Sequence, residues 1–186
     1  FGWKAEVPSL AEFTRDALSV ELGLTVPPQD GLTFGAATDA DLFADPEIGS
    51  VDMEDLVAFV AGLAEPARQR RDAALEDVGE GLFADVGCAG CHVPSLMTAD
   101  GLEVHAYSDF LLHDVALPLA GGVAQGDATL REFRTAPLWG VSASAPYMHH
   151  GRSETLLDAI GAHSAEADAA RLAFLALTPG EQSALL

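Results

Sequence analysis

The two cysteines of this chain lie three residues apart and are followed at once by a histidine, in the run Cys88-Ala89-Gly90-Cys91-His92. Two thiols at this spacing in the first turn of a helix project to one side, where each forms a thioether with a vinyl group of a porphyrin. The adjoining imidazole then lies beneath the iron as its proximal ligand. The pentapeptide therefore predicts one covalently attached c-type haem, held by Cys88 and Cys91 and ligated by His92.

Three other chemistries use paired cysteines: a dithiol redox pair, a structural disulfide and half of a zinc site. A zinc site closed by cysteines needs more of them, and the sequence has no others. His92 has no part in a disulfide. A thioredoxin-like motif follows a strand, whereas residues 79–87 read as the end of a helix and a glycine turn. The comparison favours haem attachment.

The composition is globular and strongly acidic. The hydrophobic share is 49%, and 29 Asp and Glu against nine Lys and Arg give a formal net charge of −20. Such a field repels nucleic acid and anionic membranes and favours a cationic partner, although solubility or a saline habitat is the simpler explanation. No apolar run approaches the ~20 residues that a membrane span needs.

Helical periodicity dominates both ends of the chain. The spacing of apolar residues predicts helices over 8–24, 53–63, 67–83 and 165–177. Ser153 is the predicted N-cap of a helix that runs to His163, and Thr178 that of a last helix beginning at Pro179. Between residues 93 and 151 the helical period is poor and Gly, Pro, Ser and Asp abound. We expect long pocket-wrapping loops there, with at most one short hairpin.

A low-spin electron-transfer haem needs a second axial ligand on its distal face. Met53 belongs to the predicted core of an earlier helix, and Met97 is too close to His92 to cross the ring easily. His163 lies on an apolar helix face, where an imidazole would point into the core. Met148 is the rival, at an equally acceptable separation from the haem motif. Spacing alone does not choose between them, and His/Met ligation would give the higher reduction potential.

Further segments surround the haem motif in a fixed order. They are FGWKA at 1–5, GEGLF at 79–83, GCAGCH at 87–92, YSDFLLHD at 107–114, FRTAPLWG at 133–140, and MHHGR at 148–152 followed by Thr155-Leu156. In this combination the chain resembles the C-terminal haem domain of the bacterial di-haem oxidoreductases. That group includes the di-haem cytochrome c peroxidases and related tryptophan-modifying enzymes, and the likeness is greatest to its subgroup of thiol oxidoreductases.

The resemblance implies a distal ligand. In these proteins it lies about four helical turns past the histidine of a His-Asp-Gly segment and is Met, Tyr or His. Counting from His149 reaches His163, so the resemblance implies bis-His ligation by His92 and His163. Met148 then becomes a pocket residue and the alternative ligand. His150 stands where the family usually has Asp, which puts any role of that carboxylate in doubt.

The resemblance also implies a second haem in a domain N-terminal to this one, which in the peroxidases reacts with peroxide. The chain has no second Cys-x-x-Cys-His. We expect that haem in upstream sequence, beyond a leader, and a mono-haem relative is the alternative. Residues 1–66, a helical segment with an acidic loop, are then expected to pack on or belong to the preceding haem domain. Residues 67–186 form the C-terminal haem domain.

Other side chains are candidates for the haem pocket. Guanidinium groups suit haem propionates, aromatic rings suit the porphyrin edge, and histidines can donate to propionates. The competing interpretations are surface charge for the arginines, core packing for the aromatic residues and a surface position for the histidines. The candidates are Arg134, Arg131, Trp139, Tyr147, His149, His105 and His113.

Together these features predict an all-α fold, a cytochrome c-like helical domain with long haem-wrapping loops, that transfers electrons through a closed six-coordinate haem. The expected partner is a small redox protein or a second haem domain. A free-standing mono-haem carrier and a haem-based sensor are the alternative functions. Covalent haem attachment in bacteria takes place outside the cytoplasmic membrane, so we expect a periplasmic location. The acidic loop at 39–54 is a weak calcium candidate, because it lacks the spacing of an EF-hand.

Overall fold

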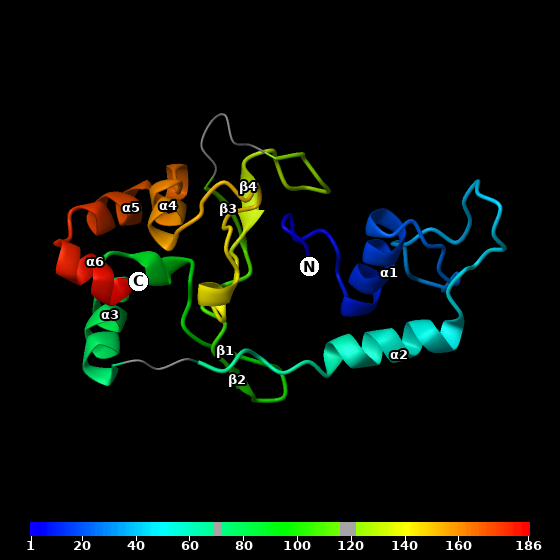
Figure 1. Ribbon diagram of the computed structural model, residues 1–186, viewed down its shortest axis with the longest axis horizontal. Helices are drawn as coiled ribbons and strands as arrows, with labels where there is room; N and C mark the ends of the chain where they lie inside the picture. The colour runs from blue at the N-terminus through cyan, green and yellow to red at the C-terminus, as the bar shows by residue number, and fades with distance from the viewer. Residues whose placement is uncertain (69–71, 116–121) are drawn as a thin grey trace. The chain divides into compact units, whose positions relative to one another are not determined.

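The computed structural model describes residues 1–68, 72–115 and 122–186. By its internal contacts the chain divides into two units, traced in Figure 1. Unit 1 comprises residues 1–2 and 6–64, and unit 2 comprises residues 3–5 and 65–186. The assignment of residues 1–66 to a preceding haem domain stays a prediction.

Unit 1 is built on two helices. α1 (Leu10–Glu21) begins at Ser9, whose hydroxyl accepts a hydrogen bond from the Glu12 backbone N–H at 3.2 Å. α2 (Ser50–Ala61) packs against α1. The predicted helices over 8–24 and 53–63 are therefore present, with ends shifted by a few residues, as is usual where caps decide the boundary.

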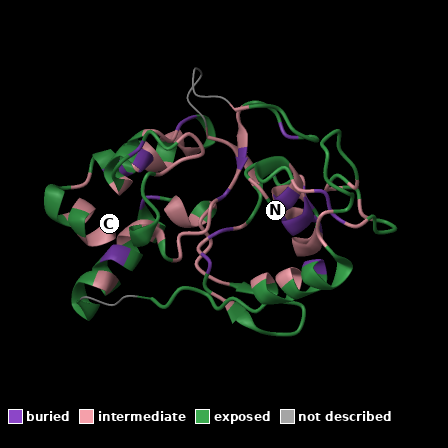
Figure 2. Ribbon diagram, turned by 45° about the vertical axis from the view of Figure 1, so that its right-hand side comes forward, coloured by how far each residue is buried: buried purple, intermediate pink, exposed green. Residues whose placement is uncertain are grey.

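The loop between these helices is fastened to α1. Arg15 is buried, and its guanidinium donates to the carbonyl oxygens of Phe34 at 3.0 Å and Pro27 at 2.7 Å. Figure 2 shows the buried positions of α1 in purple. Met53, on α2, is 5% exposed, which confirms the prediction that this N-terminal helix places it in a hydrophobic core. The buried cluster is Leu18, Val26 and Met53, with Leu24, Ile48, Leu56 and Val57 against it.

Unit 2 contains four helices and three short 3₁₀ turns among its described residues. They are α3 (Ala73–Asp85), η1 (Cys88–Gly90), η2 (Val141–Ala143), α4 (Leu156–Gly161), η3 (Ala165–Ala167), α5 (Asp168–Leu175) and α6 (Pro179–Leu185). Thr178 caps α6 and Pro179 opens it, as predicted. α3 begins after its N-cap Asp72, and residues 69–71 of the helix predicted over 67–83 lie outside the described residues.

Two small antiparallel sheets also belong to unit 2, so the expectation of an all-α fold is wrong. β1 (Leu96–Met97) pairs with β2 (Glu103–Val104), and β3 (Leu112–Asp114) pairs with β4 (Glu132–Arg134). The fold mixes helices and strands, although the helices around the Cys-x-x-Cys-His turn are in keeping with a cytochrome-like domain. Strands of two or three residues are too short to show the alternation of apolar and polar residues that predicts a strand. β3 and β4 are also distant in the sequence, so no local turn signal marks their pairing.

The N-cap predicted for α4 is also wrong. Thr155 caps this helix, since its hydroxyl accepts from the Asp158 N–H at 3.1 Å and the Asp158 carboxylate accepts from the Thr155 N–H at 3.2 Å. This reciprocal pair is a capping box, which needs an acceptor three residues after the cap. Ser153 is buried instead, and its carbonyl accepts from the Tyr147 N–H at 2.7 Å.

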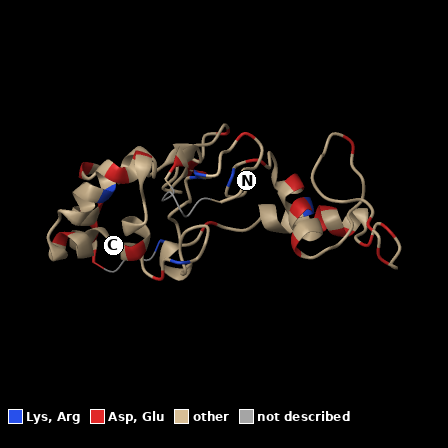
Figure 3. Cartoon of the chain, turned by 90° about the horizontal axis from the view of Figure 1, so that it is seen from above, with Lys and Arg blue, Asp and Glu red and all other residues tan. Residues whose placement is uncertain are grey.

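Two properties of the chain are its acidic charge and the limited length of its helices. Acidic side chains are spread over the elements of both units, as Figure 3 shows. Among the described residues, the helices are all too short or too polar to cross a bilayer.

α3 and α6 pack closely at a glycine. Gly79 is buried on α3, and a Cβ placed there would clash with the carbonyl oxygen of Ala184 on α6. Gly81, two residues along the same helix, has nothing within 4 Å of such a Cβ. A side chain at position 79 would therefore force the two helices apart.

We expect Gly79→Ala to destabilise the protein by about 1–3 kcal/mol, because the clash is with backbone that cannot rotate away. Gly81→Ala is the matched control and should be neutral or stabilising by about 0.5–1 kcal/mol, since alanine is the better helix former. Denaturant unfolding of the haem-loaded protein measures both. Equal stabilities for the two variants would contradict the close packing.

Candidate haem site

The Cys-x-x-Cys-His pentapeptide, which we call the haem-attachment turn after its predicted role, follows α3 through a left-handed glycine. Gly87 has φ +93°, a conformation that glycine adopts without strain. The backbone N–H groups of Cys91 and His92 then both donate to the carbonyl oxygen of Cys88, at 3.4 and 3.0 Å. Cys88, Cys91 and His92 therefore share one tight helical turn, as two thioether links and an adjoining axial ligand require.

Both thiols are half-buried and free. Burial is the main cause that raises the pKa of Cys88 above its ordinary value. Burial likewise raises the pKa of Cys91, helped by the carboxylates of Asp109 and Glu166. A dithiol redox pair depends on a thiol with a lowered pKa, so the electrostatics of this turn disfavour that alternative.

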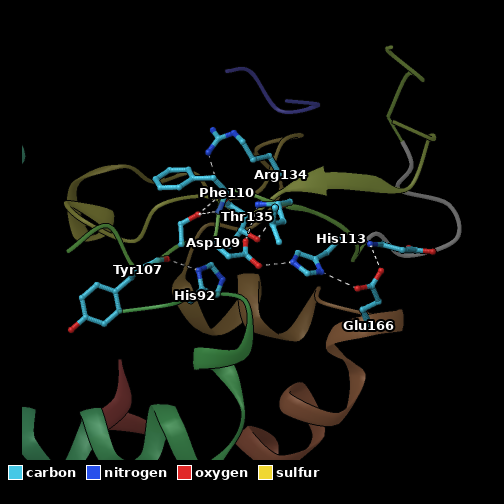
Figure 4. Close-up of polar contacts among 11 residues, drawn as sticks. His92, Tyr107, Asp109, Phe110, His113, Arg134, Thr135 and Glu166 are labelled. Carbon is cyan, nitrogen blue, oxygen red and sulfur yellow. Dashed lines mark hydrogen bonds and ion pairs between the residues drawn. The ribbon is translucent and has the colours of Figure 1, made fainter. Parts of the chain in front are cut away.

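The imidazole of His92 is held in one tautomer. Its Nδ1–H donates to the carbonyl oxygen of Tyr107 at 3.0 Å, which leaves the lone pair on Nε2 (Figure 4). The Phe83 ring lies beside it, with centroids 6.4 Å from His92 and 5.9 Å from Tyr107. Burial lowers the pKa of His92, and the nearby His163 lowers it further, against backbone hydrogen bonds to Tyr107 and Ala136 and the charge of Asp109. The neutral form, which binds metal, is thereby favoured.

A strained segment presents the Tyr107 carbonyl to His92. Tyr107 and Phe110 have φ +53° and +58°, in the left-handed region that non-glycine residues seldom adopt. We call residues 107–110 the proximal clamp. Such strain persists only where surrounding contacts over-determine it.

Buried hydrogen bonds supply those contacts. Ser108 is fully buried, and its hydroxyl donates to the Thr135 carbonyl at 2.8 Å while accepting from the Phe110 N–H at 2.9 Å. The Asp109 N–H donates to the Cys91 carbonyl at 2.9 Å. The proximal clamp is therefore fastened both to the haem-attachment turn and to the residue after β4.

His163 lies just beyond α4. The helix ends at Gly161, so the sequence prediction that His163 stands within it is wrong by two residues. Its backbone N–H donates to the Ile160 carbonyl at 3.2 Å, and its Nδ1–H donates to the Ala159 carbonyl at 2.7 Å. This leaves Nε2 of His163 with the lone pair, as at His92. The two imidazoles are near enough for their charges to interact.

A network of charged groups lies against the haem-attachment turn. His113, on β3, is bonded through Nε2 to Asp109 at 2.8 Å and through Nδ1 to Glu166 at 2.9 Å (Figure 4). The Glu166 carboxylate also accepts from the Asp114 N–H at 2.9 Å. Ligand atoms of Cys91, Asp109 and His113 all lie within 4.8 Å of one another. The sequence pointed to His113 but missed both carboxylates, of which Asp109 stands four residues before it.

The hydrogen bonds of this network determine its charges. Partial burial opposes the imidazolium form of His113, but hydrogen bonds to Glu166 and Asp109 outweigh it and raise the pKa of His113. Burial likewise opposes the charged form of Asp109, yet the bond to His113 helps lower the pKa of Asp109. The other hydrogen bond of His113, to Glu166, is the main cause that lowers the pKa of Glu166.

The two candidate arginines differ in their surroundings. Arg134, on β4, is half-buried, donates to the Thr135 carbonyl at 3.2 Å and lies 5.7 Å from the centre of the Phe110 ring. Burial lowers the pKa of Arg134. Arg131 is paired with the Asp114 carboxylate at 2.9 Å, which gives its guanidinium a partner within the protein. Pairing of Arg134 or Arg131 with a propionate stays a prediction.

Other candidates from the sequence occupy turns. Trp139 is half-buried just before η2, and Tyr147 is half-buried where its backbone bridges to Ser153. Met148 follows with φ +65° and is also half-buried. His105 is exposed. Their roles toward a haem, including ligation by Met148, stay predictions.

His149 belongs to an aromatic cluster that the sequence did not indicate. Its ring stacks on Phe133 of β4 with centroids 3.9 Å apart, and Trp3 lies edge-on to it at 6.5 Å. The single lysine, Lys4, sits over the Phe133 ring, its Nζ 3.6 Å from the ring centre, and donates to the Thr129 carbonyl at 2.8 Å. These contacts join residues 3–5 to β4 and account for their place in unit 2.

The calcium candidate is an acidic group in unit 1. Carboxylate oxygens of Asp39, Asp41 and Glu47 lie within 4.8 Å of one another. Glu47 already accepts from the Thr25 backbone N–H at 2.9 Å. Exposed acidic side chains often gather in this way without an ion, so calcium binding stays a prediction.

The donor set fits a covalently attached haem. Two thiols share one turn with His92, and both imidazoles direct Nδ1–H to backbone carbonyls of Tyr107 and Ala159. A metal-ligating histidine typically donates its other ring N–H in this way, which orients the ring and raises its basicity.

A match to a protein family agrees with a haem protein. The chain matches, over residues 1–186, the family described as "Di-haem oxidoreductase, putative peroxidase". A solved structure of hydrazine synthase from Kuenenia stuttgartiensis, pressurised with xenon, superposes with a TM-score of 0.54 at 20% identity. The match covers 76% of this chain and 55% of that one, so it bears on the fold alone. No protein of curated function matches the sequence.

The raised pKa of His113 makes stability depend on pH. Because the folded-state pKa lies above the unfolded value of about 6.5, the stabilisation is fully present below that pH and is lost as the pH rises through the folded-state pKa. We expect the difference in free energy of unfolding between the wild type and His113→Gln to shrink over that interval.

Urea unfolding at a series of pH values measures this difference. At acid pH the difference should also fall, below the ordinary carboxyl range of about 4, since Asp109 and Glu166 have lowered pKa values. His105→Gln, at an exposed histidine, is the control for the change of histidine to glutamine itself. A His113 difference that stays constant or grows from neutral to alkaline pH would contradict the ion-paired assignment.

Proposed function

The chain belongs to the di-haem oxidoreductase family, and we propose that it is an electron-transfer domain with one covalent haem attached to Cys88 and Cys91. His92 and His163 are the two axial ligands in this proposal. Membership of the family makes haem the cofactor and oxidoreduction the general role. The thioether links, the ligand pair and the relay function are the proposed part.

One observation carries the ligand assignment. His92 and His163 both donate through Nδ1 to a backbone carbonyl, at 3.0 and 2.7 Å, and His163 is near enough to lower the pKa of His92. Each ring therefore offers Nε2, and each is oriented by the protein before any metal arrives. Met148 lies in a turn with φ +65°, and none of the contacts described for it orients its thioether. The geometry supports bis-His ligation over His/Met ligation.

The ligand pair determines what the site does. When bound, haem supplies a one-electron redox centre whose potential depends on axial ligands, hydrogen bonds and burial. With imidazoles on both faces, the protein leaves no coordination position open to peroxide. The Tyr107 carbonyl raises the basicity of His92, and the Phe83 ring lies beside the His92 ring. These residues suit electron relay.

The reacting centre of such an enzyme must then lie elsewhere. We place it in a second haem domain upstream, as the family description of a di-haem protein suggests. A small redox protein is the other partner, and the net charge of −20 favours one with a cationic docking patch. Covalent attachment of haem supports an extracytoplasmic location.

His163→Ala tests the distal ligand. We expect the ferric haem-loaded protein to change from low-spin to high-spin in its absorption spectrum, because one strong-field ligand is lost. Met148→Leu is the control and should remain low-spin. A low-spin His163→Ala together with a high-spin Met148→Leu would assign the distal position to the methionine.

The haem content of the full-length gene product tests the wider role. We expect two haems per polypeptide, one of them reactive with carbon monoxide in the ferrous state and one closed. A single haem that remains closed to carbon monoxide would indicate a mono-haem carrier. A single haem that binds carbon monoxide rapidly would indicate a ligand-binding sensor and overturn the closed site.

A further inference from the structure

The Asp109–His113–Glu166 network joins the segment that holds the proximal imidazole to the segment that carries the distal one. Resting on the proposed bis-His function, we propose that His113 is a positioning residue that keeps His163 on the iron. It does so by tying Glu166, three residues beyond His163, to Asp109 of the proximal clamp.

The proximal end of this connection is rigid. Asp109 lies inside the proximal clamp, between the left-handed residues Tyr107 and Phe110. Its backbone N–H is bonded to the Cys91 carbonyl at 2.9 Å, and its carboxylate is 13% exposed. A carboxylate so placed can hold the His113 ring without moving itself, because the turn that carries it is fastened by backbone hydrogen bonds.

The distal end is tied to β3 by several bonds. Glu166 accepts from His113 at 2.9 Å through one carboxylate oxygen and from the Asp114 N–H at 2.9 Å through the other. The Ser164 backbone N–H donates to the Val115 carbonyl at 3.1 Å. Ser164 and Glu166 are thus hydrogen-bonded to the C-terminal end of β3 and the residue after it. His163 directly precedes Ser164 in the chain.

Dissociation of His163 from iron would require this segment to move. α4 ends at Gly161, so His163 stands outside the helix, and the residues C-terminal to it help to fix its position. The bond from its Nδ1 to the Ala159 carbonyl orients the ring on one side. The bonds of Ser164 and Glu166 hold the chain on the other. Weakening the bond between Glu166 and His113 therefore removes one of the contacts that hold the chain on the side of His163 that α4 does not control, and leaves the Ser164 bond in place.

Both ring nitrogens of His113 are used, which explains why a histidine suits this position. An imidazolium donates from two opposite edges and so bridges two carboxylates that cannot approach each other. Hydrogen bonds between ionised groups are stronger than neutral ones. Glutamine at position 113 has a single amide group and cannot bond to Asp109 and Glu166 at the same time.

The experiment measures, after rapid mixing, how fast carbon monoxide binds the closed ferrous haem, resolved as the phase that is absent from the fast reaction of any second, open haem. For a closed site this rate is limited by dissociation of His163. Glu166→Gln and His113→Gln should each bind about 10- to 100-fold faster than wild type, the change expected on losing a charge-assisted hydrogen bond. Their resting ferric spectra should stay mainly low-spin. Glu166→Asp keeps the charge and should give an intermediate rate.

The control is another ion pair of similar exposure. Arg171 is bonded to Asp168 at 2.8 Å on α5, with side-chain exposures of 24% and 48%, against 18% and 54% for His113 and Glu166. Arg171→Gln should bind carbon monoxide at the wild-type rate. Unfolding measurements on every variant separate a loss of stability from a change at the distal ligand.

The outcomes distinguish this proposal from the ligand assignment itself. If His163→Ala becomes high-spin while Glu166→Gln and His113→Gln bind carbon monoxide at the wild-type rate, the network is only structural and the positioning role is overturned. If His163→Ala remains low-spin, the bis-His assignment fails and the positioning role fails with it. Faster binding in both network variants, with Arg171→Gln unchanged, supports the proposal.

Discussion

The hydrogen bond from Nδ1–H of His92 to the Tyr107 carbonyl is the interaction on which the rest of the site depends. At 3.0 Å it decides which ring nitrogen carries the proton, and so which one can face a metal. It requires Tyr107 in a left-handed conformation, which the buried Ser108 and its bond to Thr135 maintain. The cost of that strain, of order 1–3 kcal/mol, is offset by the buried bonds of the proximal clamp.

The two small sheets matter because of what they join. β3 and β4 place His113 opposite Phe133, so one strand pair carries both the charged network and the aromatic cluster of Lys4 and His149. β3 and Val115, the residue after it, also receive the bonds of Glu166 and Ser164, which lie just after His163 in the sequence. Helices supply the Cys-x-x-Cys-His turn and the segment before His163, while the short strands hold the segments that carry His92 and His163 together.

Local chemistry could be predicted from the sequence and long-range pairing could not. The Cys-x-x-Cys-His turn and the cap at Thr178 are encoded within a few residues, and the structure reproduces both. The cap at Thr155 had a local signal, Asp158 three residues later, that outweighed Ser153. The sheets, the Tyr107 carbonyl and the Glu166 carboxylate are distant in sequence from the groups they contact, and backbone carbonyls leave no mark in residue type. The all-α expectation failed for that reason.

The central claim is that imidazoles from His92 and His163 hold both faces of the haem. Near-infrared magnetic circular dichroism of the ferric haem-loaded protein tests it most directly, because the energy of the charge-transfer band depends on the axial pair. The band of bis-imidazole ligation at this haem is the predicted result. The band of imidazole–thioether ligation, or of high-spin iron with one protein ligand, would contradict the account.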